Sequence, residues 1–169
     1  MIGRKEAIRS LEWDMEKDEP QFVAVYGRRR VGKTYLVRQF FKDSFAFYHT
    51  GLRKGNRVEQ LTAFRDTLVA SGHRECPVLS NWMEAFRELL RLVELLPKGR
   101  KVLFIDELPW MDTPRSDLLM ALDHFWNAWA TARSEKDVFL VICGSAASWI
   151  IRNVVRNTGG LYNRLTDQI

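Results

Sequence analysis

Apolar residues along the chain follow two alternating patterns. Several short stretches are apolar almost throughout and end at glycine, proline or charged residues, which is typical of strands buried on both faces of a sheet; they cover residues 21–26, 45–50, 101–107 and 138–145. Between them, apolar residues recur at helical spacing; these segments cover residues 4–16, 33–41, 58–69, 82–96, 114–133 and 146–156. Strands alternating with helices predict an α/β fold, with a mainly parallel sheet between two layers of helices.

The segment at 114–133 carries a long apolar stripe, formed by Leu118, Leu119, Leu122, Phe125, Trp126 and Trp129. Packing on the sheet explains this stripe better than a partner-binding face does. The segment at 82–96 follows Ser80 and Asn81, either of which can cap a helix, and Glu84 stands at the capping-box position. The pattern thus predicts long helices with defined ends.

The chain has 169 residues, of which 46% are apolar and 28% charged, so it is long enough for one soluble domain with a sizeable core. The N-terminus has no apolar signal core. The longest apolar stretch, residues 138–151, is shorter than the roughly 20 residues that span a bilayer. We therefore expect a cytoplasmic protein without membrane contact.

The net charge of +5 is compatible with a nucleic-acid partner, although a mildly basic surface explains it better. Cys76 and Cys143 fit no disulfide or metal-binding spacing and favour a reducing compartment. His49, His73 and His124 show no ligand spacing either. Composition alone therefore identifies no metal centre.

The stretch Gly27-Arg28-Arg29-Arg30-Val31-Gly32-Lys33-Thr34 matches the phosphate-binding pattern G-x-x-x-x-G-K-[ST]. Its glycines permit a tight turn whose backbone N–H groups cradle phosphate oxygens. Lys33 can reach the β- and γ-phosphates, and the Thr34 hydroxyl can ligate Mg²⁺. An expected strand precedes the loop and an expected helix follows it, which makes an ordinary glycine turn the weaker interpretation. The loop and the adjoining Tyr35 form the predicted ATP-binding set.

Two further strand ends carry polar residues. Asp106 and Glu107 end one apolar strand, where the first carboxylate can hold Mg²⁺ and the second can act as general base on a water. Ser145 ends another, and its hydroxyl can either contact the γ-phosphate or simply cap the next helix. Ligands of open α/β sheets bind outside the carboxyl ends of the strands, so we expect these residues to converge.

Together with the loop, the stretches Ile105-Asp106-Glu107-Leu108-Pro109-Trp110 and Cys143-Gly144-Ser145-Ala146-Ala147-Ser148 resemble the archaeal-type ATPases. These belong to the additional-strand, catalytic-glutamate branch of P-loop proteins, which is related to the AAA+ and STAND ATPases. The resemblance implies that Lys33 contacts phosphate, that Thr34 and Asp106 hold Mg²⁺, that Glu107 is the catalytic base, and that Ser145 is the first sensor of nucleotide.

The resemblance extends to both ends of the chain. The stretch Ile2-Gly3-Arg4-Lys5-Glu6 is similar to a Gly-Arg element near the adenine, which adds Gly3 and Arg4 to the nucleotide-binding set. The stretch Leu161-Tyr162-Asn163-Arg164 is similar to the family's Pro-Leu-Tyr-Gly-Arg motif. Gly160 and Asn163 replace the proline and the glycine of that motif, so no nucleotide contact is assigned to Arg164.

The family's sheet order, 5-1-4-3-2, is expected here with a truncated fifth strand, because the sequence ends at Ile169. We expect residues 1–169 to form a P-loop ATPase core, a fragment without the lid, winged-helix or nuclease-like domains that usually follow. The strand at 21–26 should then be an exposed edge, which predicts self-association.

The function expected from these residues is Mg²⁺-dependent ATP hydrolysis, slow in rate, that drives conformational change in attached or partner domains. The alternatives are a P-loop kinase acting on a small molecule and a nucleotide-regulated binding module with negligible turnover. The adjacent pair Asp106-Glu107 favours water as the phosphoryl acceptor. DNA or a protein is the expected partner, contacted through domains beyond residue 169.

Overall fold

The computed structural model describes residues 2–27, 32–155 and 167–168. The strands are β1 (Gln21–Tyr26), β2 (Phe47–Thr50), β3 (Lys101–Asp106), β4 (Val138–Gly144) and β5 (Asp167–Gln168). The α-helices are α1 (Ile2–Glu16), α2 (Lys33–Phe40), α3 (Arg57–Ala70), α4 (Trp82–Leu95), α5 (Leu108–Met111), α6 (Leu118–His124) and α7 (Ala147–Ile150). Two π-helical segments, η1 (Phe125–Ala130) and η2 (Ile151–Val155), continue α6 and α7.

The strands form one sheet in the order β2-β3-β4-β1-β5, and the pairs between neighbours are parallel. The predicted α/β class and the order 1-4-3-2 of the first four strands are thereby confirmed. The expectation that β1 is an open edge is wrong over its centre, because Val23 pairs with Asp167 and Ala24 pairs with Gln168. Among the described residues, β5 covers Asp167 and Gln168.

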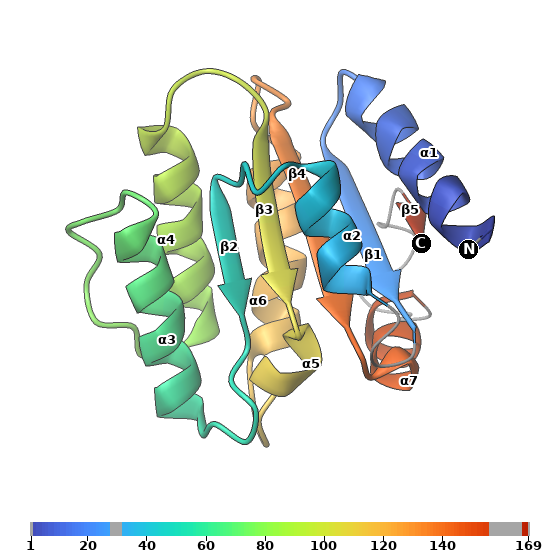
Figure 1. Cartoon of the computed structure of the whole chain (residues 1–169). Coiled ribbons are helices and arrows are strands. Elements are labelled where there is room, and N and C mark those ends of the chain that lie inside the picture. Colours follow the sequence, from blue (N-terminus) through green and yellow to red (C-terminus); the bar gives the residue numbers. More distant parts are fainter. Residues whose placement is uncertain (1, 28–31, 156–166, 169) are drawn as a thin grey trace.

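The sheet separates two apolar clusters. Alternate residues of each central strand point to opposite faces: Phe22 and Ala24 of β1 join the larger cluster, whereas Val23 and Val25 join the smaller one. The larger cluster is covered by α3, α4, α6 and η1, and the smaller one by α1 and α2. Figure 1 shows this layering, with α2 in front of the sheet and α6 behind it.

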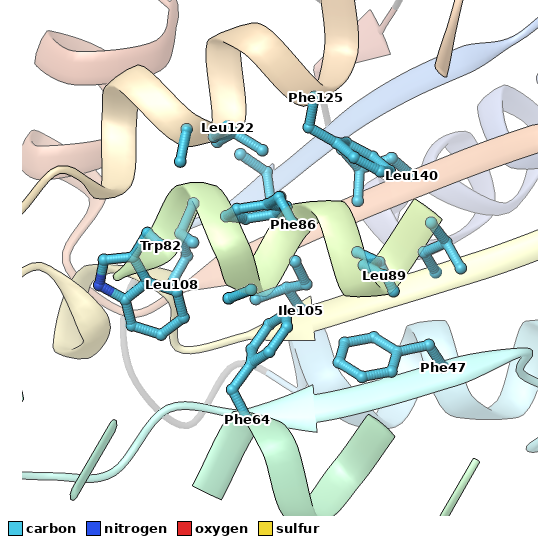
Figure 2. Close-up of a cluster of buried hydrophobic side chains, with 14 of the residues drawn as sticks. Phe47, Phe64, Trp82, Phe86, Leu89, Ile105, Leu108, Leu122, Phe125 and Leu140 are labelled. Atoms are coloured by element: carbon cyan, nitrogen blue, oxygen red, sulfur yellow. The ribbon is translucent and has the colours of Figure 1, made fainter. Parts of the chain in front are cut away.

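Aromatic rings dominate the larger cluster (Figure 2). Phe86 of α4 lies at its centre, with ring centroids 5.8 Å from Phe64, 6.4 Å from Trp82 and 5.4 Å from Phe125. The apolar stripe of α6 and η1 also packs here, as predicted. Buried rings of this size contribute much of the apolar area that stabilises a domain.

The helix expected at 114–133 begins later and is less regular than predicted. Arg115 has a φ of 60°, a left-handed conformation that a right-handed helix cannot include. α6 therefore starts at Leu118, whose backbone N–H is capped by the Ser116 hydroxyl at 3.1 Å. At Phe125 the helix widens into η1. The predicted cap of α4 is confirmed, because the Asn81 side chain accepts a hydrogen bond from the Glu84 N–H at 2.8 Å.

Candidate nucleotide site

The carboxyl ends of the central strands meet at one edge of the sheet. Tyr26 of β1 stands opposite Gly144 of β4, and Ile105 of β3 stands opposite Ile142 of β4. Gly27 and Ser145, which follow β1 and β4, and Asp106, which ends β3, are therefore brought to the same edge, as the sequence predicted. In parallel α/β sheets this edge is where ligands bind.

The described ends of the phosphate loop have the backbone conformation that their glycines permit. Gly27 has a φ of 153° and Gly32 a φ of 82°, both unfavourable for residues with a Cβ. Gly32 directly precedes α2, and the Lys33 ammonium donates a hydrogen bond to the Gly27 carbonyl at 2.9 Å. A cationic side chain and a helix N-terminus thus border the same small region, an arrangement suited to an anion.

Thr34 and Asp106 meet across the gap between α2 and β3. The Thr34 hydroxyl donates to Asp106 Oδ2 at 2.6 Å, although the two residues are far apart in sequence. Asp106 is buried, and its other oxygen accepts the Glu107 N–H at 2.8 Å. A hydroxyl and a carboxylate held together are oxygen donors of the kind that Mg²⁺ prefers, so the residues fit the metal that the sequence implies.

Glu107 has a strained backbone that directs its side chain toward β4. Its φ of 52° and ψ of 44° lie in the left-handed region, which is uncommon for residues other than glycine. The carboxylate Oε2 accepts hydrogen bonds from the Ser145 hydroxyl at 3.2 Å and from the Ser145 N–H at 3.4 Å. Strain of this kind is concentrated at functional sites. The left-handed turn brings Glu107 and Ser145 together.

Two glycines allow close packing around this turn. A Cβ at Gly144 would lie 2.7 Å from Pro109 Cδ, and a Cβ at Gly51 would lie 2.5 Å from the Glu107 carbonyl oxygen. Neither distance is tolerable for a real side chain. Neither requirement is apparent from the sequence, because both depend on how α5 folds back over β2 and β4.

α5 is anchored on two sides by polar contacts that the sequence did not indicate. The buried Gln60 of α3 donates to the Trp110 carbonyl at 3.1 Å and to the Leu52 carbonyl at 2.6 Å. Asp112 accepts the indole N–H of Trp149 in α7 at 3.1 Å, and burial raises the pKa of this carboxyl. The segment that follows Glu107 is therefore linked to α3 and α7.

The N-terminal helix lies beside α2. The Arg4 guanidinium donates to the Gln39 side chain at 2.8 Å and stands 4.9 Å from the centre of the exposed Tyr35 ring. Gly3 is exposed one position earlier. Three residues of the predicted nucleotide-binding set, Gly3, Arg4 and Tyr35, thus lie close together at the start of α1 and α2.

The chain matches, over residues 1–167, the family described as an ATPase domain predominantly from Archaea. The protein belongs to this family. The resemblance to the archaeal-type ATPases inferred from the sequence is confirmed, and the chain is an ATPase domain of this family.

An uncharacterized protein of Methanocaldococcus jannaschii is 22% identical over 165 residues, which cover 98% of this chain and 34% of that protein. An uncharacterized ATP-binding protein of the same organism is 38% identical over 42 residues, 25% of this chain and 71% of that protein. The domain therefore spans about a third of the first relative's length.

Solved structures agree on the fold. The Drosophila ORC bound to AT-rich DNA and Cdc6 contains a chain with a TM-score of 0.53 and 16% identity, aligned over 94% of this chain and 52% of that one. The Drosophila ORC bound to DNA contains a chain with a TM-score of 0.52 and 14% identity, aligned over 94% of this chain and 86% of that one. At these identities the similarity shows the fold alone.

Several predicted residues of the ATPase domain lie outside the described part of the chain: Arg28, Arg29, Arg30, Val31 and the stretch 161–164 with Arg164. Among the described helices, none is long and apolar enough to cross a membrane.

Proposed function

We propose that this ATPase domain binds ATP with Mg²⁺ at the loop from Gly27 to Thr34 and hydrolyses it slowly, with Glu107 as general base. The observation that carries the proposal is the 2.6 Å hydrogen bond between Thr34 and Asp106, with Glu107 directly adjacent. Two oxygen donors and a second carboxylate then stand beside a phosphate-binding loop. This is the set that phosphoryl transfer to water requires.

In this proposal each residue has a distinct task. The backbone N–H groups of the loop and the Lys33 ammonium bind the β- and γ-phosphates. Thr34 and Asp106 hold Mg²⁺, which when bound neutralises negative charge on the phosphate oxygens. Glu107 accepts a proton from the attacking water. The oxygen of that water forms a bond to the γ-phosphorus, and the bond from the γ-phosphorus to the bridging oxygen of ADP breaks.

Ser145 acts on the Glu107 carboxylate in the proposal. Its hydroxyl and its backbone N–H both donate to the Glu107 carboxylate, and these two hydrogen bonds orient that carboxylate. A water that takes the place of the Ser145 hydroxyl on Glu107 is positioned for proton transfer, and the hydroxyl becomes available to the γ-phosphate. Ser145 thereby connects the state of the nucleotide to the position of the base.

Conformational coupling would begin at α5. A change in the contact between Glu107 and Ser145 moves the left-handed turn that starts α5. The hydrogen bonds from Gln60 to Trp110 and from Trp149 to Asp112 then carry that movement to α3 and α7. In the proposed ATP site, Gly3, Arg4 and Tyr35 lie on the adenine side, and residues 28–31 belong to the phosphate loop.

Binding is tested by calorimetry with Lys33→Ala, which should abolish measurable ATP affinity because the main cationic contact to the β- and γ-phosphates is removed. The matched control is Lys98→Ala, an exposed lysine before β3 at the opposite end of the sheet. ATP affinity unchanged in the Lys33 variant would refute the assignment of the phosphate loop.

Catalysis is tested by phosphate release from Glu107→Gln. The amide preserves the shape of the side chain but accepts protons poorly, so turnover should fall by about 10²–10⁴-fold while ATP affinity is retained. Glu12→Gln, an exposed position on α1, is the control and should behave as the unmodified chain. Turnover equal to that of the unmodified chain in the Glu107 variant would exclude this residue as the base.

The same assays separate the alternatives. Phosphate release without an added acceptor distinguishes hydrolysis from a kinase reaction, and tight ATP binding with negligible turnover identifies a binding module. A DNA or protein partner is a separate proposal, supported by the net charge of +5 and by the DNA present in both Drosophila complexes. Fluorescence anisotropy with labelled duplex DNA, with and without ATP, tests the DNA partner directly.

A further inference from the structure

Three buried residues of different chemistry meet on the outer side of the α3–α4 pair, away from the nucleotide site. They are His73 and Cys76 in the connection after α3, and Glu88 in α4. One ligand atom of each, an imidazole nitrogen, the thiol sulfur and a carboxylate oxygen, all lie within 4.8 Å of one another. We propose that these residues bind one divalent transition-metal ion of the Zn²⁺ type.

The local structure explains why the residues meet. The Cys76 N–H donates to the His73 carbonyl at 3.2 Å, so a single turn presents both the imidazole and the thiol. The Arg65 guanidinium of α3 holds this turn by donating to the carbonyls of Cys76 at 3.0 Å and Pro77 at 3.1 Å. The connection then folds back along α4, where Glu88 faces the turn. In Figure 1 this connection runs outside α3, at the side of the sheet that is farthest from α1.

The set of donor atoms selects the metal. One nitrogen, one sulfur and one oxygen suit Zn²⁺, whereas Mg²⁺ prefers oxygen alone. With bond lengths of about 2.0–2.3 Å, a tetrahedral ion separates its ligand atoms by roughly 3.3–3.8 Å. His73 Nε2 and Glu88 Oε2 stand 2.5 Å apart, so the ion takes the place of their hydrogen bond and these atoms move apart slightly. The Cys76 thiol releases its proton to solvent on binding.

The surroundings support such a site. Arg91 donates to the other carboxylate oxygen of Glu88 at 2.7 Å, which orients Oε2 toward His73. A surface hollow lined by Gly72, His73, Arg91 and Glu94 reaches the cluster, so an ion can enter and a water can be its fourth ligand.

The hydrogen bonds that link His73, Glu88 and Arg91 do not involve Cys76, so they alone do not explain a buried thiol at this position. Cys76 is 2% exposed, and the interaction of its thiol with the Pro77 carbonyl oxygen at 3.5 Å is weak. Metal binding gives this buried thiol a defined role. It also joins the long connection to α4, whose inner face carries the aromatic core.

The test uses the full chain, freed of metal by a chelator and then titrated with Co²⁺. Coordination by a thiolate in a tetrahedral site produces charge-transfer absorption in the near ultraviolet and intense visible bands, which an oxygen-only site such as that of Thr34 and Asp106 does not. We expect saturation at one equivalent, displacement by Zn²⁺, and a higher midpoint of thermal unfolding with Zn²⁺.

Cys76→Ser and Glu88→Gln should each weaken binding by about 100-fold or more, since the loss of a supporting partner alone costs about 10–100-fold. Cys143→Ala, which removes the other thiol, should leave the spectrum unchanged. Cys76→Ser changes a single atom, which keeps the test valid if another variant fails to fold. Absence of the charge-transfer band, its loss in the Cys143 variant, or unchanged affinity in the Cys76 variant would overturn the proposal.

Discussion

The two faces of the sheet are packed in different ways. The face covered by α3, α4, α6 and η1 is a large apolar cluster with many aromatic rings, and the face covered by α1 and α2 is a smaller one. The nucleotide site lies beside the smaller cluster, at the end of the sheet, and is held by single hydrogen bonds such as that of Thr34 with Asp106. The free energy gained by burying apolar surface does not depend on the orientation of the groups. Hydrogen bonds and close contacts at glycine, in contrast, require particular distances and angles.

Stability and chemistry therefore depend on separate residues. Substitutions in the larger cluster should reduce the free energy of unfolding and leave the site intact in the molecules that remain folded. Substitutions around Glu107 should alter turnover at a smaller cost in stability.

Phe86→Ala should give the largest loss of stability. The ring is fully buried among Phe64, Trp82 and Phe125, and truncation of a core phenylalanine typically costs about 3–5 kcal/mol. Denaturant unfolding measures the loss, and Trp13→Ala, at a side chain 66% exposed, is the control, with an expected change within about 0.5 kcal/mol. If Phe86→Ala also loses ATP affinity at temperatures where the variant remains folded, the larger cluster and the nucleotide site are not independent.

His49 gives the larger cluster a pH dependence. Burial lowers its pKa from 6.5 to about 4. Nδ1 bonds to the Thr67 hydroxyl at 2.8 Å, while Nε2 has no hydrogen-bond partner among the described residues. The unfolded chain therefore takes up a proton near pH 6.5 that the folded chain resists until about pH 4.

The stability that depends on neutral His49 is thus complete above pH 6.5 and is lost as the pH falls toward 4. A shift of this size corresponds to about 3 kcal/mol. Unfolding free energies of the unmodified chain and of His49→Gln, measured between pH 7.5 and pH 4, isolate this contribution from the carboxylates. Parallel pH profiles for the two proteins would show that His49 is not responsible.

The sequence predicted the strands and the convergence of the site residues well, and the family resemblance implied the order of the first four strands. Strands buried on both faces are apolar throughout, and the spacing of Gly27 to Thr34 follows from the geometry of phosphate binding. The late start of α6 was not predictable, because Arg115 adopts a left-handed conformation for which its side chain gives no signal.

Contacts between distant segments were also missed. The hydrogen bonds of Gln60 and the grouping of His73, Cys76 and Glu88 depend on how α5 and the α3–α4 connection fold back. A glutamine on a helix resembles a surface residue in sequence, and a histidine far from its carboxylate shows no ligand spacing. Local patterns therefore identified the elements and the phosphate loop, and tertiary packing determined the rest.

Gly144→Ala should have the smallest effect on stability and still impair turnover. The added methyl group would stand 2.7 Å from Pro109 Cδ, and overpacking of this kind costs about 1–3 kcal/mol, part of it relieved by movement of α5. Such movement displaces Glu107 from Ser145, so phosphate release should fall more than the melting midpoint suggests. The double variant Gly144→Ala with Pro109→Ala removes the opposing ring and should recover much of the lost turnover. Equal turnover in all these proteins would show that the close fit of Gly144 and Pro109 has no part in positioning Glu107.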